Sequence, residues 1–146
     1  PETLEVENAP AGTIHRLWNR RQTTFFNGAS NIAQAGGLAA LGDEGHQACL
    51  SLVDYYKGNA RIIKEGLESI GLRCYGGTDS PYIWAECRNG MTSWEFFDFL
   101  LDKAHVVVTP GSGFGAAGEG YVRVSAYGHR EDVEAAVASI KEHIND

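Results

Sequence analysis

Residues 81–125 read PYIWAECRNGMTSWEFFDFLLDKAHVVVTPGSGFGAAGEGYVRVS, and the order of patterns in this stretch decides the fold. Residues 82–87 are mostly apolar and aromatic, which predicts a strand. The sequence TSWE at 92–95 fits a capping box and predicts the start of a helix. Residues 106–109 are β-branched and predict a buried strand. Residues 121–125 predict one more strand, so the stretch alternates strands with a helix.

Helices are predicted on both sides of this stretch. Between residues 43 and 70 the apolar side chains recur at steps of four and three residues, the spacing of one helix face. They are Cys49, Val53, Tyr56, Ala60, Ile63, Leu67 and Ile70. Gly71 is placed to end this helix in a left-handed conformation, and residues 72–75 predict a short strand. The order of elements predicts an α/β fold with one small sheet and packed helices.

The side chains that the two later helices bury can also be predicted. The helix after residue 92 is expected to bury Phe97, Leu100, Leu101 and Ala104. The last helix is expected to bury Val133, Ala136, Val137, Ile140 and Ile144.

The first 26 residues show little periodicity, and a helix-start signal follows at residues 27–31. The helix that it opens carries small residues on one face and two adjacent glycines, Gly36 and Gly37, which lower helix propensity. Two interpretations are open. The helix is tightly packed and buried, or Asn27 faces a ligand at a helix N-terminus, where free N–H groups attract anions.

Composition excludes several classes of protein. The chain has 146 residues, about one domain in length. It is 43% hydrophobic and carries a net charge of −7 without a basic run, so we expect no nucleic-acid partner. No apolar stretch approaches about 18 residues, so we expect no membrane span. The first residues lack a start methionine and the features of a signal peptide, and the chain is expected to begin within a longer protein.

The cysteines, histidines and lysines give weak signals. Cys49, Cys74 and Cys87 form no C-x-x-C pair and have no zinc-ligand spacing, so we expect buried free thiols and no metal site. His105 and His129 are interpreted as structural. The four lysines all fall on predicted helices, in settings typical of exposed charge, and no apolar pocket is indicated around them. They are Lys57, Lys64, Lys103 and Lys141.

Residues 110–120 contain five glycines, which makes this loop costly in backbone entropy. No helix follows it, so neither a P-loop nor a dinucleotide-binding fingerprint fits. The interpretation that remains is a shaped loop at a strand end, near a binding site.

Arg123 lies in the middle of a predicted strand, between Val122 and Val124. Because side chains alternate along a strand, Arg123 points away from the core if the valines face it. Two interpretations are open: an ordinary exposed or locally paired arginine, or a fork that binds a carboxylate through two parallel hydrogen bonds.

Five blocks of sequence together resemble the diaminopimelate branch of the fold-type I, class I/II aminotransferases. They are FNGASN at 26–31, YGG at 75–77, PYIW at 81–84, PGSGFG at 110–115 and GEGYVRVSAYGHR at 118–130. The blocks occur in the same order as in the family, and the resemblance extends from about residue 13 to the C-terminus. The resemblance implies that residues 43–146 form the small C-terminal domain of such an enzyme and that residues 1–42 lead into it from the large domain.

The resemblance implies an enzyme that binds pyridoxal 5'-phosphate and moves an amino group between LL-2,6-diaminopimelate and 2-oxoglutarate, giving tetrahydrodipicolinate and glutamate for lysine biosynthesis. It implies that Arg123 binds a substrate carboxylate and that Asn27 contacts substrate and cofactor across a homodimer interface. Both the bacterial cytoplasm and the plastid stroma fit the family. The family's Schiff-base lysine matches none of the lysines here, so this C-terminal third is not expected to transaminate by itself.

Two alternatives stay open at this level. The chain could be a stand-alone α/β module that binds a carboxylate through Arg123 and the glycine loop, or it could belong to another branch of the class I/II aminotransferases.

Overall fold

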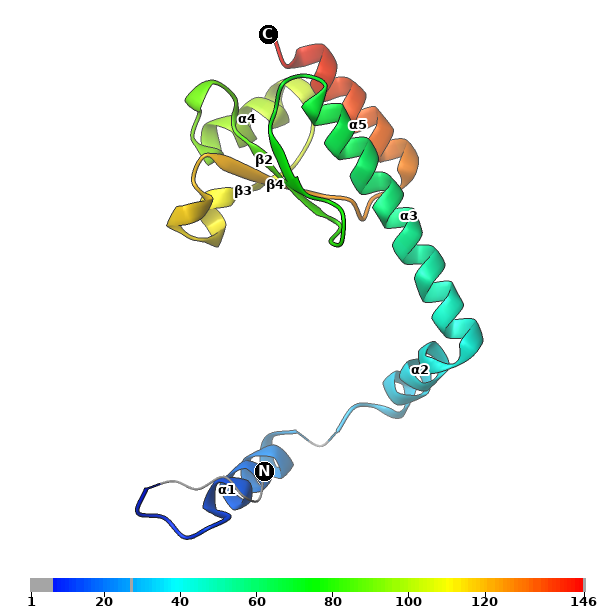
Figure 1. The fold of residues 1–146 in the computed structure, drawn as a ribbon, viewed down its shortest axis with the longest axis vertical. Coiled ribbons are helices and arrows are strands. Elements are labelled where there is room, and N and C mark those ends of the chain that lie inside the picture. The colour runs from blue at the N-terminus through cyan, green and yellow to red at the C-terminus, as the bar shows by residue number, and fades with distance from the viewer. Residues whose placement is uncertain (1–6, 27, 146) are drawn as a thin grey trace. The chain divides into compact units, whose positions relative to one another are not determined.

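The computed structural model describes residues 7–26 and 28–145 (Figure 1). Its helices are α1 (Thr13–Phe25), α2 (Asn31–Leu41), α3 (Asp43–Glu68), α4 (Ser93–Ala104) and α5 (Arg130–His143), and short 3-10 turns cover Arg88–Gly90, Gly111–Phe114 and Ala116–Gly118. Its strands are β1 (Cys74–Gly76), β2 (Tyr82–Glu86), β3 (Thr109–Pro110) and β4 (Tyr121–Ser125). The chain divides into two compact units, residues 1–46 and 47–146, which are described separately.

The first unit holds α1 and α2. The predicted start of α2 is confirmed: Ser30 is its N-cap, and the Ser30 hydroxyl accepts a hydrogen bond from the Ala33 N–H at 3.3 Å. The expectation of a tightly packed α2 is not met by the described residues. None of the α2 side chains is buried, and a Cβ added to Gly36 or Gly37 would meet no atom within 4 Å.

Helix α3 ends as the sequence predicts. Gly71 has a φ of 86°, its N–H donates to the Glu68 carbonyl at 3.0 Å, and the Leu72 N–H donates to the Leu67 carbonyl at 3.2 Å. These two bonds form a Schellman cap. The predicted apolar stripe is buried only at Ala60, Ile63 and Leu67, toward the C-terminal end, whereas Cys49 and Val53 are exposed.

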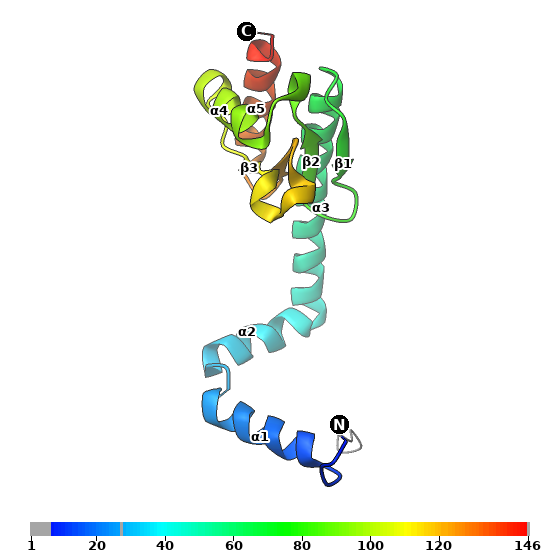
Figure 2. The same ribbon diagram turned by 90° about the vertical axis from the view of Figure 1, so that its left-hand side faces the viewer.

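The four strands of the second unit form one antiparallel sheet in the order β1-β2-β4-β3 (Figure 2). The core lies between one face of this sheet and the helices α3, α4 and α5. Its largest fully buried apolar side chains are Phe96, Ile83 and Val122. The predicted α/β class, a small sheet with packed helices, is confirmed.

The capping box of α4 is confirmed: the Glu95 N–H donates to the Thr92 hydroxyl, and the Glu95 carboxylate accepts from the Thr92 N–H at 2.8 Å. The predicted buried face of α4 is wrong at two of its four residues. Phe96 lies in the core instead of Phe97, which is only half-buried. Phe96, Leu100 and Ala104 follow one another at steps of four, whereas Leu101 falls outside this line and is exposed.

The predicted buried strand at 106–109 is also largely wrong. The strand β3 covers only Thr109 and Pro110, and the Val107 side chain is 74% exposed. The cause lies at His105, which adopts a φ of 57° and turns the chain, so that the Val106 N–H donates to the Leu100 carbonyl instead of to a strand. In α5, Ala136 is half-buried and the other predicted core residues are buried.

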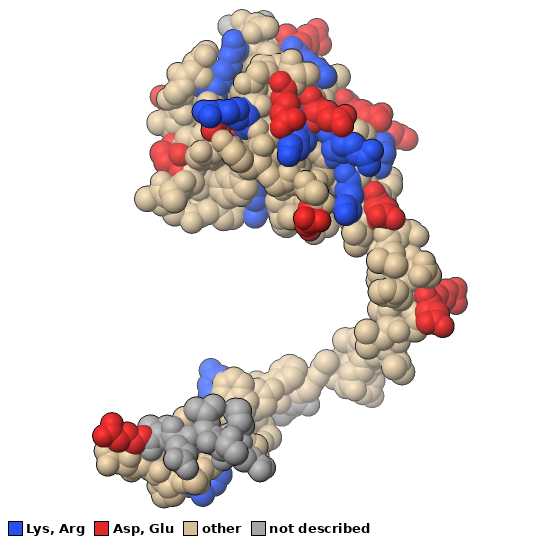
Figure 3. Space-filling view, viewed as in Figure 1, with Lys and Arg blue, Asp and Glu red and all other residues tan. Residues whose placement is uncertain are grey.

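Surface features of the described residues are unremarkable in charge. Acidic and basic side chains lie next to one another on the visible face of the second unit (Figure 3). Arg73 and Glu86 form an ion pair at 2.7 Å. No described helix is long and apolar enough to cross a membrane.

The thiols are free, as predicted, but the expectation that they are buried is wrong. Cys49 is exposed, and Cys74 and Cys87 are half-buried.

Candidate functional site: Arg123 and its aromatic neighbours

Arg123 lies on the face of the sheet opposite the core. Its neighbour Val122 is 1% exposed and faces the core, as do Ile83 and Ala85 of β2. In the register of the sheet Arg123 pairs with Trp84 on one side and Thr109 on the other. The prediction that Arg123 points away from the core is therefore confirmed, and a strand with partners on both sides fixes its backbone.

Two aromatic rings contact the Arg123 guanidinium. Its central carbon lies 4.4 Å from the centroid of the Tyr82 ring and 4.4 Å from that of Phe114. Each contact has the geometry of a cation–π interaction. Trp84 packs edge-on against Phe114 with ring centroids 5.4 Å apart, which closes one side of the group. The rings fix the plane of the guanidinium, which decides where a bound carboxylate must lie.

The guanidinium has no polar partner among the described residues. The Arg123 Nε atom is buried and forms no hydrogen bond with a described residue. The Ser112 hydroxyl, in the 3-10 turn that follows β3, is also buried without a hydrogen-bond partner among the described residues. Buried donors without partners are rare and point to a missing ligand or packing partner. The interpretation of Arg123 as an exposed or locally paired arginine is thus wrong, since it is half-buried and no described carboxylate contacts it.

A hollow of about 550 Å³ opens beside this group on the same face of the sheet. Its lining is aromatic and glycine-rich: Tyr75, Trp84, Phe114, Ala117, Gly118 and Tyr121. An apolar wall next to an unpartnered cation suits a ligand that carries a carboxylate on a short carbon chain.

The glycine loop beside Arg123 is held by close backbone contacts. A Cβ added to Gly111 would lie 2.6 Å from the Tyr121 carbonyl oxygen and would clash with that of Gly118. Gly118 is restricted in the same way by Gly111. Only glycine lets these two segments meet, so the loop folds back on itself and places Phe114 over the guanidinium.

The end of the loop is tied to the start of α4. The Glu119 carboxylate accepts hydrogen bonds from the N–H groups of Ser93 at 2.7 Å and Gly120 at 3.1 Å. These backbone bonds, that from Ser93 above all, lower the pKa of Glu119. Ser93 is fully buried, and its hydroxyl accepts from the Gly120 N–H at 3.1 Å. Burial, with the Glu119 charge as a second cause, raises the pKa of the nearby Cys87 thiol to about 11.

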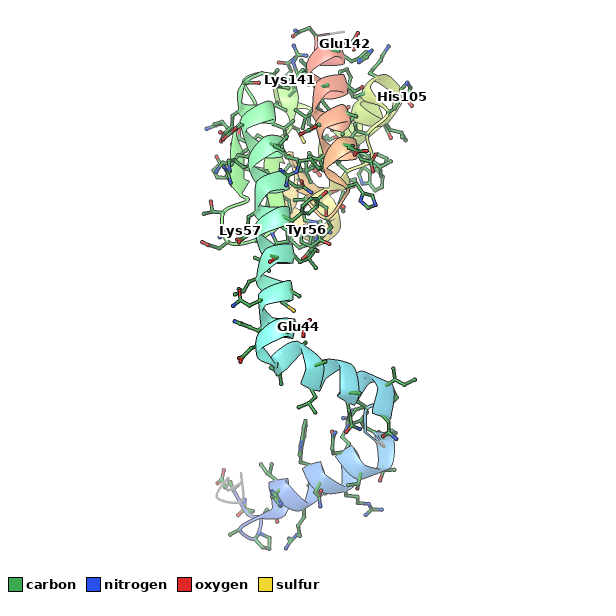
Figure 4. The ribbon with its side chains drawn as sticks, turned by 90° about the vertical axis from the view of Figure 1, so that its right-hand side faces the viewer. Glu44, Tyr56, Lys57, His105, Lys141 and Glu142 are labelled. Atoms are coloured by element: carbon green, nitrogen blue, oxygen red, sulfur yellow. The ribbon has the colours of Figure 1, made fainter. Side chains whose placement is uncertain are left out.

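None of the four lysines lines the hollow beside Arg123. Lys57 on α3 and Lys141 on α5 are exposed (Figure 4), and so is Lys103. Lys64 is half-buried, and its amine lies 3.4 Å from the Gly76 carbonyl oxygen. No cluster of three metal-ligating side chains occurs within residues 7–26 and 28–145.

The structure places none of the other predicted candidate residues at Arg123. Asn27 lies outside the described residues. His105 and His129 are exposed at a helix C-cap and N-cap, and His129 makes no side-chain capping bond.

Tyr82 and Phe114 contact the Arg123 guanidinium and are not singled out by the sequence patterns. Phe114 is the one large side chain between residues 111 and 118, a signal that could have found it. Tyr82 carries no such signal, because its contact with Arg123 depends on the register of β2 against β4.

Comparison with known proteins places the chain in a family. The model of the family "Aminotransferase class I and II" matches residues 14–140. The LL-diaminopimelate aminotransferase of Bacteroides fragilis (strain YCH46) is 50% identical over 142 residues, which cover 97% of this chain and 34% of that relative.

Two solved aminotransferase structures are similar to the chain over nearly its whole length. An L,L-diaminopimelate aminotransferase from Chlamydomonas reinhardtii superimposes with a TM-score of 0.88 at 47% identity, over 97% of this chain and 34% of that one. An aromatic aminotransferase from Pyrococcus horikoshii OT3 has a TM-score of 0.80 at 28% identity, over 94% and 37%. The chain thus spans about a third of the length of these relatives. With the family model matching most of its length, the chain belongs to the class I and II aminotransferases.

Proposed function

We propose that these residues form the carboxylate-binding C-terminal part of an LL-diaminopimelate aminotransferase. The reaction would transfer an amino group between LL-2,6-diaminopimelate and 2-oxoglutarate, giving tetrahydrodipicolinate and glutamate in lysine biosynthesis. The identity to the Bacteroides fragilis relative supports this branch of the family. In this proposal residues 43–146 are the small domain, residues 1–42 lead into it, and the complete enzyme is a homodimer.

One observation carries the proposal. The Arg123 guanidinium is oriented by two rings at 4.4 Å, and its buried Nε has no partner among the described residues. An arginine fork held in one plane binds a carboxylate with two parallel hydrogen bonds. Both proposed substrates carry an α-carboxylate, so the same fork would bind the amino donor in one half-reaction and the keto acid in the other.

In such an enzyme pyridoxal 5'-phosphate supplies the chemistry of amino-group transfer. The described residues do not fit a site for it, since Lys57, Lys103 and Lys141 are exposed, the Lys64 amine lies by the Gly76 carbonyl oxygen, and no lysine lines the hollow beside Arg123. We therefore assign the cofactor's lysine and phosphate contacts to the part of the relatives that this chain does not match. Asn27 remains our proposal for a contact to substrate and cofactor, made across the dimer interface.

The role of Arg123 in the chemistry is to bind and orient. It fixes the carboxylate end of the substrate, and the aromatic wall beside it keeps water from that end. Orientation of this kind lowers the barrier because the substrate is held before it reacts. Movement of the small domain could carry the bound carboxylate toward the reacting atoms.

The test is Arg123→Lys in the complete enzyme. Lysine keeps the charge but loses the two-pronged geometry, so we expect a loss of about 2 to 4 kcal/mol in transition-state stabilisation, or about 30-fold to 900-fold in kcat/KM. The matched control is Arg73→Lys, because Arg73 is exposed and only pairs with Glu86. An unchanged kcat/KM for Arg123→Lys would remove Arg123 from this role.

Substrate choice separates the proposal from its alternatives. Turnover of aromatic amino acids in place of LL-diaminopimelate would move the chain to the branch of the Pyrococcus horikoshii relative. Binding of dicarboxylates by a protein without transaminase activity would favour a stand-alone binding module.

A further inference from the structure

A fully buried amide lies on α3, away from the residues that contact the Arg123 guanidinium. Asn59 is 0% exposed, and its side chain is fully hydrogen-bonded to the far end of the chain. Its Nδ2 donates to the carbonyl oxygens of Ala126 at 3.0 Å and Gly128 at 2.9 Å, and its Oδ1 accepts from the Arg130 Nε at 2.9 Å. A buried amide is costly unless it is satisfied, so these three bonds fix residues 126–130 onto α3.

Tyr55 adds to the same attachment. Its hydroxyl accepts from the Arg130 backbone N–H at 2.7 Å, and its carbonyl accepts from the Arg130 Nη2 at 3.0 Å. Arg130 also lies close against α3, since a Cβ added to Gly58 would lie 2.7 Å from that same nitrogen. We call Tyr55, Asn59 and Arg130 the α3 clamp.

The segment held by the α3 clamp leads directly to the Arg123 site. Tyr127 lies between the two carbonyl groups that Asn59 holds, and its ring packs edge-on against Tyr56 at 4.8 Å and Tyr82 at 5.7 Å. Tyr82 is one of the two rings on the guanidinium. The Ala126 N–H also donates to the Pro81 carbonyl at 2.9 Å, which joins the segment to the start of β2.

We propose that Asn59 is a positioning residue for the carboxylate site, acting through the backbone of residues 126–128, the Tyr127 ring and the Tyr82 ring on the Arg123 guanidinium. The inference rests on the proposed role of Arg123. An arginine side chain is long and flexible, and a carboxylate fork works only when its plane is fixed. Loss of the clamp lets Tyr127 and Tyr82 move, and the guanidinium loses that fixed plane.

The experiment measures the dissociation constant of glutarate, an unreactive dicarboxylate, by calorimetry on the complete enzyme, with Tm recorded alongside. Asn59→Asp keeps the acceptor for Arg130 and removes both donors to the backbone. Tyr127→Ala removes the intervening ring, and since Tyr127 is half exposed, this variant folds even where Asn59→Asp does not. We expect each to weaken glutarate binding about 10-fold, and Tyr127→Phe to restore it.

The matched control is Ser139→Ala. The Ser139 hydroxyl donates to the Ala104 carbonyl at 2.7 Å, which joins α5 to the end of α4 on the core side of the sheet. This variant is expected to lower Tm and to change glutarate binding less than about twofold. An equal loss of glutarate affinity in Ser139→Ala would reduce Asn59 to a general structural role and overturn the inference.

A double mutant separates the two proposals. With Arg123→Gln in place, Asn59→Asp or Tyr127→Ala should weaken glutarate binding no further; an additive loss would overturn the positioning role. Unchanged glutarate affinity in both Asn59→Asp and Tyr127→Ala would also overturn it. If Arg123→Gln alone leaves glutarate affinity unchanged, the proposed function of Arg123 fails first.

Discussion

The two rings that hold Arg123 are equally close to it and are supported in different ways. Tyr82 belongs to a strand, and its support comes from α3 through Tyr127 and the buried Asn59 amide. Phe114 belongs to a loop, and its support comes from the contact of Gly111 with Gly118 and from the Glu119 carboxylate at the start of α4. The first support uses side chains that link distant segments, whereas the second uses backbone contacts and one charge.

This difference predicts different sensitivities. The Phe114 side has no space for an added side-chain atom at Gly111 and depends on an ionised carboxylate. The Tyr82 side depends on hydrogen bonds of a neutral amide and on ring packing. Substitutions on each side can therefore test whether the two supports act independently.

The largest effect is expected for Gly111→Ala. Its Cβ would meet the backbone oxygen atoms of Gly118 and Tyr121 and, at 2.9 Å, the Trp84 ring, and backbone atoms cannot move away cheaply. We expect a loss of about 3 kcal/mol in the free energy of unfolding, measured by urea denaturation. Gly113→Ala is the control, since a Cβ there meets nothing within 4 Å; equal stability of the two variants would contradict the close-contact explanation.

A smaller effect is expected when each ring is removed in turn. Tyr82 is half-buried, whereas Phe114 is 50% exposed, and a cation–π contact is stronger when it is desolvated. In the complete enzyme Tyr82→Leu should weaken glutarate binding about 10-fold and Phe114→Leu about threefold. Trp94→Leu, which changes an exposed aromatic ring that packs against Phe97 on α4, should leave the affinity unchanged. A larger loss for Phe114→Leu would reverse the order of the two supports.

The pH dependence of stability should show that the support of Phe114 depends on the ionised Glu119 carboxylate. Because the pKa of Glu119 is lowered in the folded state, its contribution is present above the unfolded carboxyl pKa of about 4.3 and is lost as pH falls through the folded value. The stability difference between the wild type and Glu119→Gln should therefore shrink between about pH 5 and pH 3 in urea titrations.

Glu95→Gln provides the comparison for this experiment. The Thr92 backbone N–H lowers the pKa of Glu95, so its stability effect has the same sign and pH direction. Only Glu119→Gln should also weaken glutarate binding, because only Glu119 holds the loop that carries Phe114. Equal glutarate affinities for the two variants would separate Glu119 from the site.

The smallest effect concerns Cys87. Burial and the Glu119 charge raise its thiol pKa to about 11, so roughly one molecule in a thousand carries the thiolate at pH 8. Glu119→Gln should accelerate alkylation of Cys87 by iodoacetamide, followed by mass spectrometry. Cys74, whose pKa is also about 11 but responds to burial and Glu68, should react at an unchanged rate. Equal acceleration at both thiols would mean general loosening of the domain.

Much of the fold could be predicted because its signals are local. The capping box at Thr92 and Glu95 and the stop at Gly71 depend on residues within one or two turns, and both were correct. The predicted strand at 106–109 was largely wrong for the opposite reason. Its β-branched residues favour a strand, but the left-handed His105 and the bond from Val106 back to α4 turn the chain away.

From α2 onward the sequence by itself determined most of the order of helices and strands, but it did not predict α1, because residues 1–26 show little periodicity. It also placed Arg123 on the side of β4 away from the core, because side-chain alternation is a property of the strand alone. Tertiary structure decided which rings hold the guanidinium, that its Nε has no partner among the described residues, and that Asn59 holds the segment behind it. The reason is physical: cation–π contacts and buried hydrogen bonds depend on distances in space between residues far apart in the chain. No local pattern of residue types encodes those distances.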